Sequence, residues 1–227
     1  MKTKEWRNKV KREGWRPGPW DGEPDKKQWV DAKTGYPCLV VRNEGIGNLC
    51  GYVGVPKGHP AYGLHYDGIT QADADINTKR WNLHSRLYSA AGCPPISLQD
   101  PHRINPAWSK IEDEVEKKFG PRRDTPAGTA GVAVRGISVH GGLTYADKCS
   151  GSICHDPDDG EPDDVWWFGF DCAHSGDVCP WMDRHYQSEH EKYKDVRYVE
   201  SEVASLAKQL KAMETINDNH KPMREEG

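Results

Sequence analysis

The chain contains 227 residues, 35% of them hydrophobic and 29% charged, and its formal net charge is -4. This slight acidity gives no overall electrostatic field that would attract nucleic acid, so DNA binding is not expected. No apolar run approaches the length of a membrane span, and the basic start lacks the apolar segment of a secretion signal, which predicts a cytoplasmic protein with no membrane partner. Seven cysteines, an odd number in such a chain, favour reduced thiols over a disulfide framework.

The first part of the chain predicts a solvated start followed by antiparallel strands. The length suits a single domain over residues 1–227. A basic N-terminal segment, residues 1–17, carries six lysines and arginines among its first twelve residues and is expected to be a solvated, frayed helix. A sheet-containing body over residues 18–190 follows. Three of its β-like runs are bounded by tight-turn sequences and predict antiparallel strands: Gln28–Ala32, Tyr36–Arg42 and Leu49–Val55.

The middle of the chain lacks a sustained hydrophobic period. Residues 56–106 are expected to be a long irregular insertion that contains a short helix near residues 77–89. The next segment, Pro106–Phe119, carries stronger helix signals, because Asn105 suits the N-cap, a proline occupies the first helical position and lysines stand near the end. Residues 120–131 are expected to be a mobile loop.

The last predicted element is a long helix over residues 191–216. Apolar residues recur there at alternating three- and four-residue steps, which is typical of a helix with one apolar seam: Val196, Val199, Val203, Leu206, Leu210 and Met213. The seam is expected to pack on the chain's own sheet, and the alternative is a homodimer through a coiled coil of this helix. These elements predict an α+β fold with a mainly antiparallel sheet, long irregular loops and a long C-terminal helix.

The candidate site lies on two further predicted strands on either side of an acidic turn, around residues 134–146 and 165–172. Because side chains alternate between the two faces of a strand, each of these strands has an apolar face and a polar face with glycine gaps. If the strands pair as a hairpin, their polar faces bring His140 and Asp171 together. His174 and Asp177 follow at the end of the second strand, in the sequence D-C-A-H-S-G-D.

This grouping supports two kinds of chemistry. An imidazole beside carboxylates suits a general acid–base pair or a Zn²⁺ or Mn²⁺ site, whose predicted ligands are His140, Asp171, His174 and Asp177. In the metal-free interpretation Asp171 orients His140 or His174 as the base, so these three residues are the predicted catalytic groups. A structural alternative stays open, in which the two aspartates accept backbone N–H bonds that shape the loop and the histidines are satisfied polar residues.

Residues with aromatic or polar side chains elsewhere on these segments are the candidate ligand contacts. Thr144, Tyr145 and Trp167 belong to the two predicted strands and are expected to contact a ligand. Upstream, the sequence G-Y-V-G-V-P-K-G-H-P-A-Y-G resembles no phosphate-binding loop, since no helix with Lys-Ser/Thr follows it. Four side chains in and directly after it are candidates for the rim of a pocket: His59, Tyr62, His65 and Tyr66.

Six segments stand out along the chain: G-P-W-D-G-E-P-D-K-x-Q-W, P-C-L-V-V-R-N, G-Y-V-G-V-P-x-x-H-P, V-H-G-G-L-T-Y-A, D-D-V-W-W-F-G-F-D-C-A-H-S-G-D and Y-K-D-V-R-Y-V. In this order they resemble a family of proteins encoded by tailed bacteriophages and prophages. The resemblance spans most of residues 18–210, H-G-G-L-T and F-D-C-A-H-x-x-D are its most specific marks, and residues 70–130 resemble a variable insertion. It implies an accessory role in the host cytoplasm and supplies no reaction.

Two functions fit these observations. The first is a phage accessory protein that works as a metal-dependent hydrolase of a nucleotide or a nucleotide-derived signal. The second is a non-catalytic anti-defence inhibitor that binds a host defence protein or sequesters a small ligand. The hydrolase is favoured, because polar residues on a sheet face interrupted by glycines are better explained by a site than by packing.

Overall fold

Six strands form one antiparallel sheet in the order β1-β2-β3-β4-β6-β5. The computed structural model describes residues 3–92, 106–161, 163–182 and 191–218. The strands are β1 (Lys4–Trp6), β2 (Lys26–Val30), β3 (Pro37–Arg42), β4 (Leu49–Pro56), β5 (Tyr145–Asp147) and β6 (Val165–Asp171). Strands β2, β3 and β4 follow one another as hairpins, as the tight turns between the predicted runs require. The α+β fold with an antiparallel sheet is thereby confirmed.

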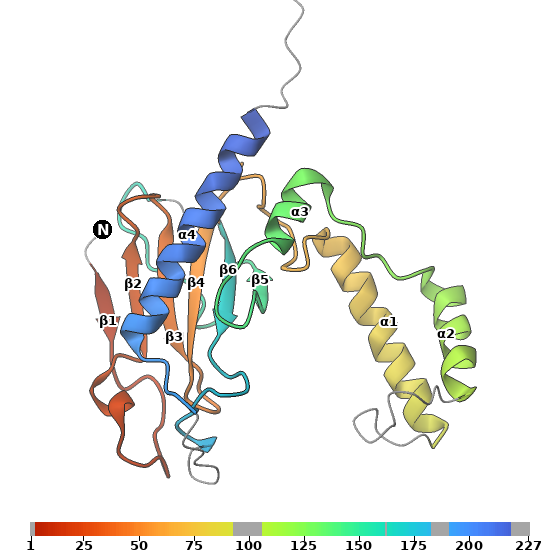
Figure 1. Cartoon of the computed structure of the whole chain (residues 1–227), viewed down its shortest axis with the longest axis horizontal. Coiled ribbons are helices and arrows are strands. Elements are labelled where there is room, and N and C mark those ends of the chain that lie inside the picture. The colour runs from red at the N-terminus through yellow and green to blue at the C-terminus, as the bar shows by residue number, and fades with distance from the viewer. Residues whose placement is uncertain (1–2, 93–105, 162, 183–190, 219–227) are drawn as a thin grey trace, which may run out of the picture.

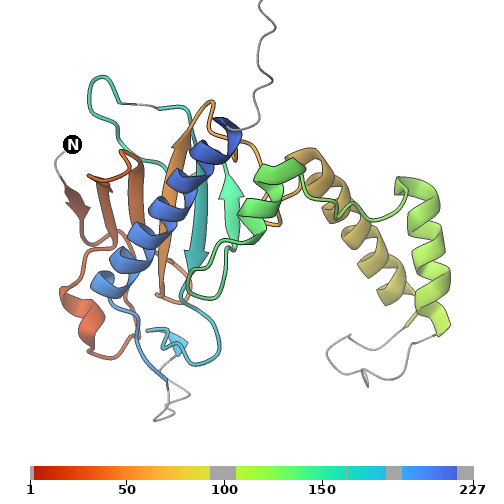
Figure 2. The same cartoon turned by 45° about the horizontal axis from the view of Figure 1, so that its top comes forward.

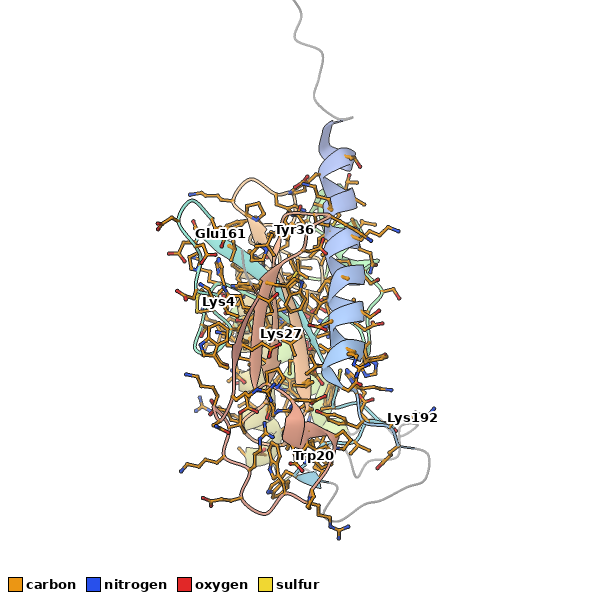
Figure 3. The ribbon with its side chains drawn as sticks, turned by 90° about the vertical axis from the view of Figure 1, so that its left-hand side faces the viewer. Lys4, Trp20, Lys27, Tyr36, Glu161 and Lys192 are labelled. Carbon is orange, nitrogen blue, oxygen red and sulfur yellow. A yellow bond between two sulfur atoms is a disulfide. The ribbon has the colours of Figure 1, made fainter. Side chains whose placement is uncertain are left out.

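Both faces of this sheet are buried. In β3, Cys38 and Val40 belong to the larger core, whereas Leu39 and Val41 belong to a smaller core on the opposite face. This explains why every residue of β3 is buried, although antiparallel sheets often leave one face in water. Figure 3 shows the sheet edge-on, with helix α4 on one side and the segment that carries Glu161 on the other.

Helix α4 (Val196–Asp218) covers the larger core. Its Val199, Val203, Leu206 and Leu210 side chains are fully buried, and the helix lies on β3 and β4. The predicted apolar seam is therefore confirmed, and it packs on the chain's own sheet instead of pairing with a second copy. The helix begins at Val196 rather than at residue 191.

Helices α1 (Gln71–Ala90) and α2 (Pro106–Phe119) form a hairpin that extends away from the sheet, as Figures 1 and 2 show. We call this hairpin the arm. Its side chains form a small core of their own around Tyr88, Ile111 and Val115. The predicted helix Pro106–Phe119 is confirmed, whereas its predicted N-cap, Asn105, lies outside the described residues.

The helix predicted near residues 77–89 is present but longer than predicted, because α1 has 20 residues, and the described residues 57–70 before it are irregular, as predicted. Thr70 caps this helix by accepting a hydrogen bond from the backbone N–H of Asp73. Helix α1 is polar along most of its length and buries few side chains, among them Ala74 and Tyr88. Such a helix has a weak hydrophobic period, which explains why the sequence pattern did not reveal its full length.

The segment before β5 also differs from the prediction. Residues 120–127 of the predicted loop 120–131 have no helix or strand, as predicted, but its last four residues and the start of the predicted strand 134–146 belong to helix α3 (Gly128–Arg135), and only β5 joins the sheet. Val134 is buried in the larger core, and Ala130 and Ala133 pack against it at helical spacing. Strands β5 and β6 do pair across the acidic turn, as predicted.

The basic N-terminal segment contributes a strand rather than the predicted helix. Strand β1 pairs with β2, with Glu5 opposite Lys27. The Lys4 ammonium lies 3.0 Å from carboxylate oxygens of both Asp156 and Asp158 in the acidic turn. The acidic turn therefore neutralises one lysine of the basic segment, Lys4 at the start of β1.

A buried charge network joins the N-terminal segment, β3 and the start of α4. The Arg42 side chain is fully buried, and its guanidinium donates to Asp25 Oδ1 (3.1 Å), Glu23 Oε2 (2.8 Å) and the Tyr193 hydroxyl (2.9 Å). Glu23 Oε1 also accepts the backbone N–H of Val196, the first residue of α4 (3.0 Å). Three of the six motif segments supply these side chains, so part of that pattern has a structural role.

Asp25 is the most constrained carboxylate of this network. Burial by itself would raise the pKa of the Asp25 carboxyl, but hydrogen bonds from Arg12 and from the backbone N–H groups of Val10 and Lys9 hold it below its usual value. Asp25 is therefore ionised in the folded protein and ties the N-terminal segment to the sheet.

Two cysteines of the segment between β5 and β6 form a disulfide, Cys149–Cys154, so the prediction of reduced thiols was wrong for this pair. The bond closes a short turn on the face of the sheet opposite α4. Four cysteines within the described ranges are free and buried: Cys38, Cys50, Cys172 and Cys179. No helix in the described part of the chain is both long enough and apolar enough to span a bilayer.

Candidate functional site

His140 lies in the turn between α3 and β5, not on a strand as predicted. Its backbone N–H donates to Glu202 Oε2 on α4 (2.8 Å). Both ring nitrogens have partners, because Nε2 lies 2.7 Å from Asp177 Oδ2 and Nδ1 lies 2.9 Å from the Tyr198 hydroxyl. Only 15% of the His140 side chain and 3% of the Asp177 side chain are exposed. The site is therefore centred on a largely buried His140–Asp177 pair with Tyr198 beyond it.

Asp177, His140 and Tyr198 form a chain of hydrogen bonds that we call the relay. An ionised carboxylate only accepts, so His140 Nε2–H donates to Asp177 and Nδ1 accepts from the Tyr198 hydroxyl. Burial and the neighbouring Glu202 raise the pKa of the Tyr198 phenol, which keeps it protonated at neutral pH. Tyr198 is 36% exposed and is the relay member that faces solvent. The order carboxylate, imidazole, hydroxyl is the one that activates hydroxyl nucleophiles in hydrolases.

Lys194 lies beside two members of the relay. Its Nζ is 3.7 Å from Asp177 Oδ1 and 5.0 Å from the centroid of the Tyr198 ring. A cation over the face of a phenol ring is attracted to its electrons, and the attraction grows when the oxygen becomes anionic. Lys194 therefore favours loss of the Tyr198 proton, whereas Glu202 opposes it.

The D-C-A-H-S-G-D segment after β6 curls around Asp177. Asp177 Oδ2 accepts the backbone N–H of His174 (3.0 Å), and Asp171 Oδ1 accepts that of Ala173 (3.0 Å). These are the bonds that the structural alternative predicted for the two aspartates. Asp177 thus both shapes the loop and orients His140, a role that the sequence pattern assigned to Asp171.

Gly141 allows the two most distinctive motifs to touch. Its φ of +66° is one that side chains rarely adopt, and a Cβ placed on it would lie 1.8 Å from His174 Nε2. The His140 turn therefore packs directly on the loop after β6. This close approach requires glycine and explains the first glycine of the H-G-G sequence, whereas Gly142 has nothing within 4 Å and only its φ of +87° favours glycine.

His174 and Asp171 lie beside the relay rather than within it. His174 Nε2 is 3.7 Å from Asp171 Oδ1, and the ring centroids of His140 and His174 are 5.6 Å apart. The His174 Nε2 atom is buried and has no hydrogen-bond partner. Across the described residues, no group of three or more His, Cys, Asp or Glu side chains is placed to hold a metal ion. The four predicted residues thus share one neighbourhood, and zinc or manganese binding by them stays a prediction.

The candidate ligand contacts on the two strands do not form one open face. Trp167 is fully buried in the smaller core. The glycine gap at Gly169 is filled by the Tyr52 ring, which would lie 2.2 Å from a Cβ there. Tyr145 packs edge-on against Tyr52 with 5.5 Å between ring centroids, and Thr144 is exposed. The gap in β6 is therefore explained by an aromatic ring of the protein itself.

The upstream candidates divide into two pairs. His59 is buried, accepts the backbone N–H of Ala61 at Nδ1 (3.0 Å) and donates from Nε2 to Leu210 O (2.9 Å). Burial lowers the pKa of His59, so it is neutral and links its loop to α4. Tyr62 donates to Asp164 Oδ1 (2.6 Å). The other two candidates border a cavity beside the arm: His65 and Tyr66.

The sequence interpretation missed Tyr198 and Lys194 as site residues. Both belong to the Y-K-D-V-R-Y-V segment, which was noted for its resemblance and not for its chemistry. No local spacing connects this segment to His140, which lies 58 residues upstream of Tyr198. Only the packing of α4 against the turn before β5 brings them together.

No known protein-family model, no curated protein and no solved structure matches this chain. The phage-family resemblance therefore stays a prediction. The contacts of the relay provide the chemical basis for the function proposed below.

Proposed function

We propose that this protein is a phage-encoded accessory protein that acts in the host cytoplasm as a hydrolase of a small nucleotide-like molecule, with the relay as its reacting centre. The observation that carries the reaction is the hydrogen-bonded order Asp177, His140, Tyr198. The phage context rests on the sequence resemblance, and the substrate class follows from that context.

Tyr198 is the nucleophile in this proposal. Its oxygen attacks the electrophilic phosphorus or carbonyl carbon of the substrate, and its proton passes to His140 Nδ1. The imidazolium then gives this proton to the leaving group as the bond to that group breaks. Asp177 fixes the imidazole tautomer and stabilises the imidazolium, and Lys194 stabilises the developing phenolate.

A water molecule completes the reaction. It attacks the ester formed on Tyr198 while His140 accepts one of its protons. The same proton returns to the Tyr198 oxygen as the ester bond breaks. The relay is thereby regenerated, and the net reaction is hydrolysis.

Turnover of mononucleotides, dinucleotides and cyclic nucleotides, followed by mass spectrometry, tests this proposal. Tyr198→Phe keeps the ring beneath Lys194 and removes the hydroxyl, so turnover is expected to fall about 1000-fold or more. Asp177→Asn is expected to reduce turnover by roughly 100-fold or more, because the imidazole loses its oriented tautomer. Tyr36→Phe is the matched control, since it removes a hydroxyl that donates to Glu214 elsewhere on α4.

Three results bear on the proposal directly. A mass increase on Tyr198 in rapidly quenched samples would support the covalent step. Unchanged turnover in folded Tyr198→Phe protein would remove the relay as the reacting centre. Absence of turnover with every nucleotide would contradict the hydrolase.

The predicted metal site is tested separately. The buried and unpartnered His174 Nε2 atom is the observation that favours it. Bound Zn²⁺ or Mn²⁺ at His140, Asp171, His174 and Asp177 would supply an activated water. Elemental analysis of the purified protein is expected to find bound metal that is lost in His174→Ala, and metal-free wild-type protein would contradict the site.

The non-catalytic alternative is an inhibitor that sequesters a small ligand or binds a host defence protein. The cavity beside the arm favours the ligand-binding form, because it lies apart from the relay. Saturable binding of one ligand per chain without turnover would distinguish this function from the hydrolase.

A further inference from the structure

Residues of the arm line a cleft. Its volume is about 380 Å³, which is near the lower end of the roughly 300–1,000 Å³ typical of small-molecule sites. The cleft is lined by residues of α1, of α2, of the segment before α1 and of the segment after α2. No relay residue lines it, so whatever binds there is recognised by other chemistry.

His84 is the most unusual side chain of this cleft. The residue is only 3% exposed, and both of its ring nitrogens are buried without a hydrogen-bond partner. The nearest carboxylate oxygen, Glu112 Oε2, lies 3.8 Å from Nε2, which is beyond hydrogen-bonding distance. The Tyr88 hydroxyl, on the next turn of α1, is also buried and unpartnered. Buried polar atoms without partners are rare and costly, and a polar ligand in the cleft would satisfy those of His84.

Aromatic rings provide flat surfaces around His84. The ring centroid of Trp108 is 4.1 Å from that of His84. Trp81 is 55% exposed, and its ring lies within 6° of parallel to that of His84 with 6.2 Å between centroids. A tryptophan that keeps this much surface in water beside a cleft is a ready stacking surface for a planar ring.

The charged side chains of the cleft indicate that the group bound there carries no large net charge. Arg80 is buried and is already engaged by Glu112. Arg122 forms an ion pair with Asp124 (2.9 Å). Each of these cations has its own carboxylate, so neither is left to neutralise a polyanion.

We propose that this cleft binds a planar nitrogen heterocycle of nucleobase size, as a free base or as a nucleoside. The heterocycle stacks on Trp81 and exchanges hydrogen bonds with His84, and its N–H groups donate to Glu112. A planar ring can stack on the exposed face of Trp81. Its ring nitrogens can form hydrogen bonds with the unpartnered nitrogens of the His84 imidazole. The proposal goes beyond hydrolysis at the relay and holds whether or not the relay is catalytic.

Titration calorimetry with adenine, adenosine, guanosine and cytidine tests the proposal, with naphthalene as a flat ring that has no nitrogen. At least one of the four probes is expected to bind saturably with one site per chain. Trp81→Ala is expected to weaken that binding at least about fivefold, and His84→Leu about tenfold. Trp181→Ala is the matched control, because Trp181 is 47% exposed and does not line the cleft.

Each variant is compared with the wild type by its helical circular dichroism, so that unfolding of the arm is recognised. Because Trp81 is exposed, Trp81→Ala is expected to leave the arm folded. It therefore still tests the proposal if His84→Leu unfolds the arm. No saturable binding of any probe at millimolar concentration would overturn the proposal. Binding that survives Trp81→Ala unchanged, or naphthalene binding as tight as that of the best probe, would overturn it as well.

Discussion

Arg42→Met is expected to destabilise the fold by about 3 kcal/mol. Removal of one partner of a buried ion pair costs about 3–5 kcal/mol, because the other charge remains buried without compensation. Here the lower end applies, since Asp25 keeps Arg12 (2.5 Å) and Glu23 keeps the Tyr193 hydroxyl (2.5 Å). A loss of about 3 kcal/mol corresponds to a fall in Tm of roughly 6–12 °C for a chain of this size.

Urea denaturation followed by tryptophan fluorescence measures this loss. Arg122→Met is the matched control, because the Arg122 side chain is 72% exposed, and its free energy of unfolding is expected to change by less than about 0.5 kcal/mol. The double variant Arg42→Met/Glu23→Gln is expected to recover part of the loss, since Asp25 keeps Arg12 as its partner and the Glu23 carboxylate no longer lacks a cation. A loss below about 1 kcal/mol in Arg42→Met, with an unchanged urea slope, would refute the reasoning.

Two more predictions concern single residues of the site and of the network. Gly141→Ala is expected to displace His174 and to shift the histidine resonances of the site in NMR spectra, because its Cβ would lie 1.8 Å from His174 Nε2. Gly142→Ala has similar backbone strain at φ +87° but nothing within 4 Å, so an equal effect in both variants would contradict the close approach. Asp25 has a folded pKa below its usual 3.8, so its contribution to stability is present above about pH 4 and is lost as the pH falls through the folded pKa. In Asp25→Asn the free energy of unfolding should therefore fall less steeply as the pH is lowered below about 4. An unchanged pH dependence would exclude Asp25 as a source of stability.

The sheet and its covering helix were predictable because their patterns are local. Strands β2 to β4 are short β-rich runs between tight turns, and the seam of α4 repeats over its whole length. A hydrophobic repeat of this kind shows which face of a strand or helix is buried, whichever element packs against that face. Helix α2 was predictable for a similar reason, since its signals stand at its own two ends.

Helix α3 was missed because its composition resembles that of a strand. The run V-A-V-R-G-I-S-V contains four β-branched residues, which favour a strand when the run is considered alone. In the structure the first part of this run packs on the larger core as a helix beside α4. Tertiary contacts therefore decided between two local preferences of similar strength.

The candidate site was predictable as a set of motifs but not as a geometry. The sequence indicated His140, Asp171, His174 and Asp177, and the structure brings them into one neighbourhood. The pairing of His140 with Asp177 depends on a turn that the pattern took for a strand. Tyr198 enters from α4, and no spacing rule connects it to the turn.

The arm is expected to be a separable unit. The Ala127 backbone N–H donates to Gly68 O (2.8 Å). The segment that leads into the arm and the segment that leads out of it therefore lie side by side. The aromatic core of the arm is distinct from the cores of the sheet. Replacement of residues 71–125 by a short Gly-Ser linker should therefore leave the sheet folded, with a free energy of unfolding within about 1 kcal/mol of the whole chain.

The same excision separates the two sites. A chain without the arm keeps Asp177, His140 and Tyr198 but loses Trp81 and His84, so it should lose heterocycle binding and keep any turnover that the relay supports. Calorimetry and the nucleotide assay measure the two properties on one preparation. If the shortened chain does not fold, the arm belongs to the same cooperative unit as the sheet. If it folds and still binds the heterocycle, the ligand is held by the body and not by the cleft of the arm.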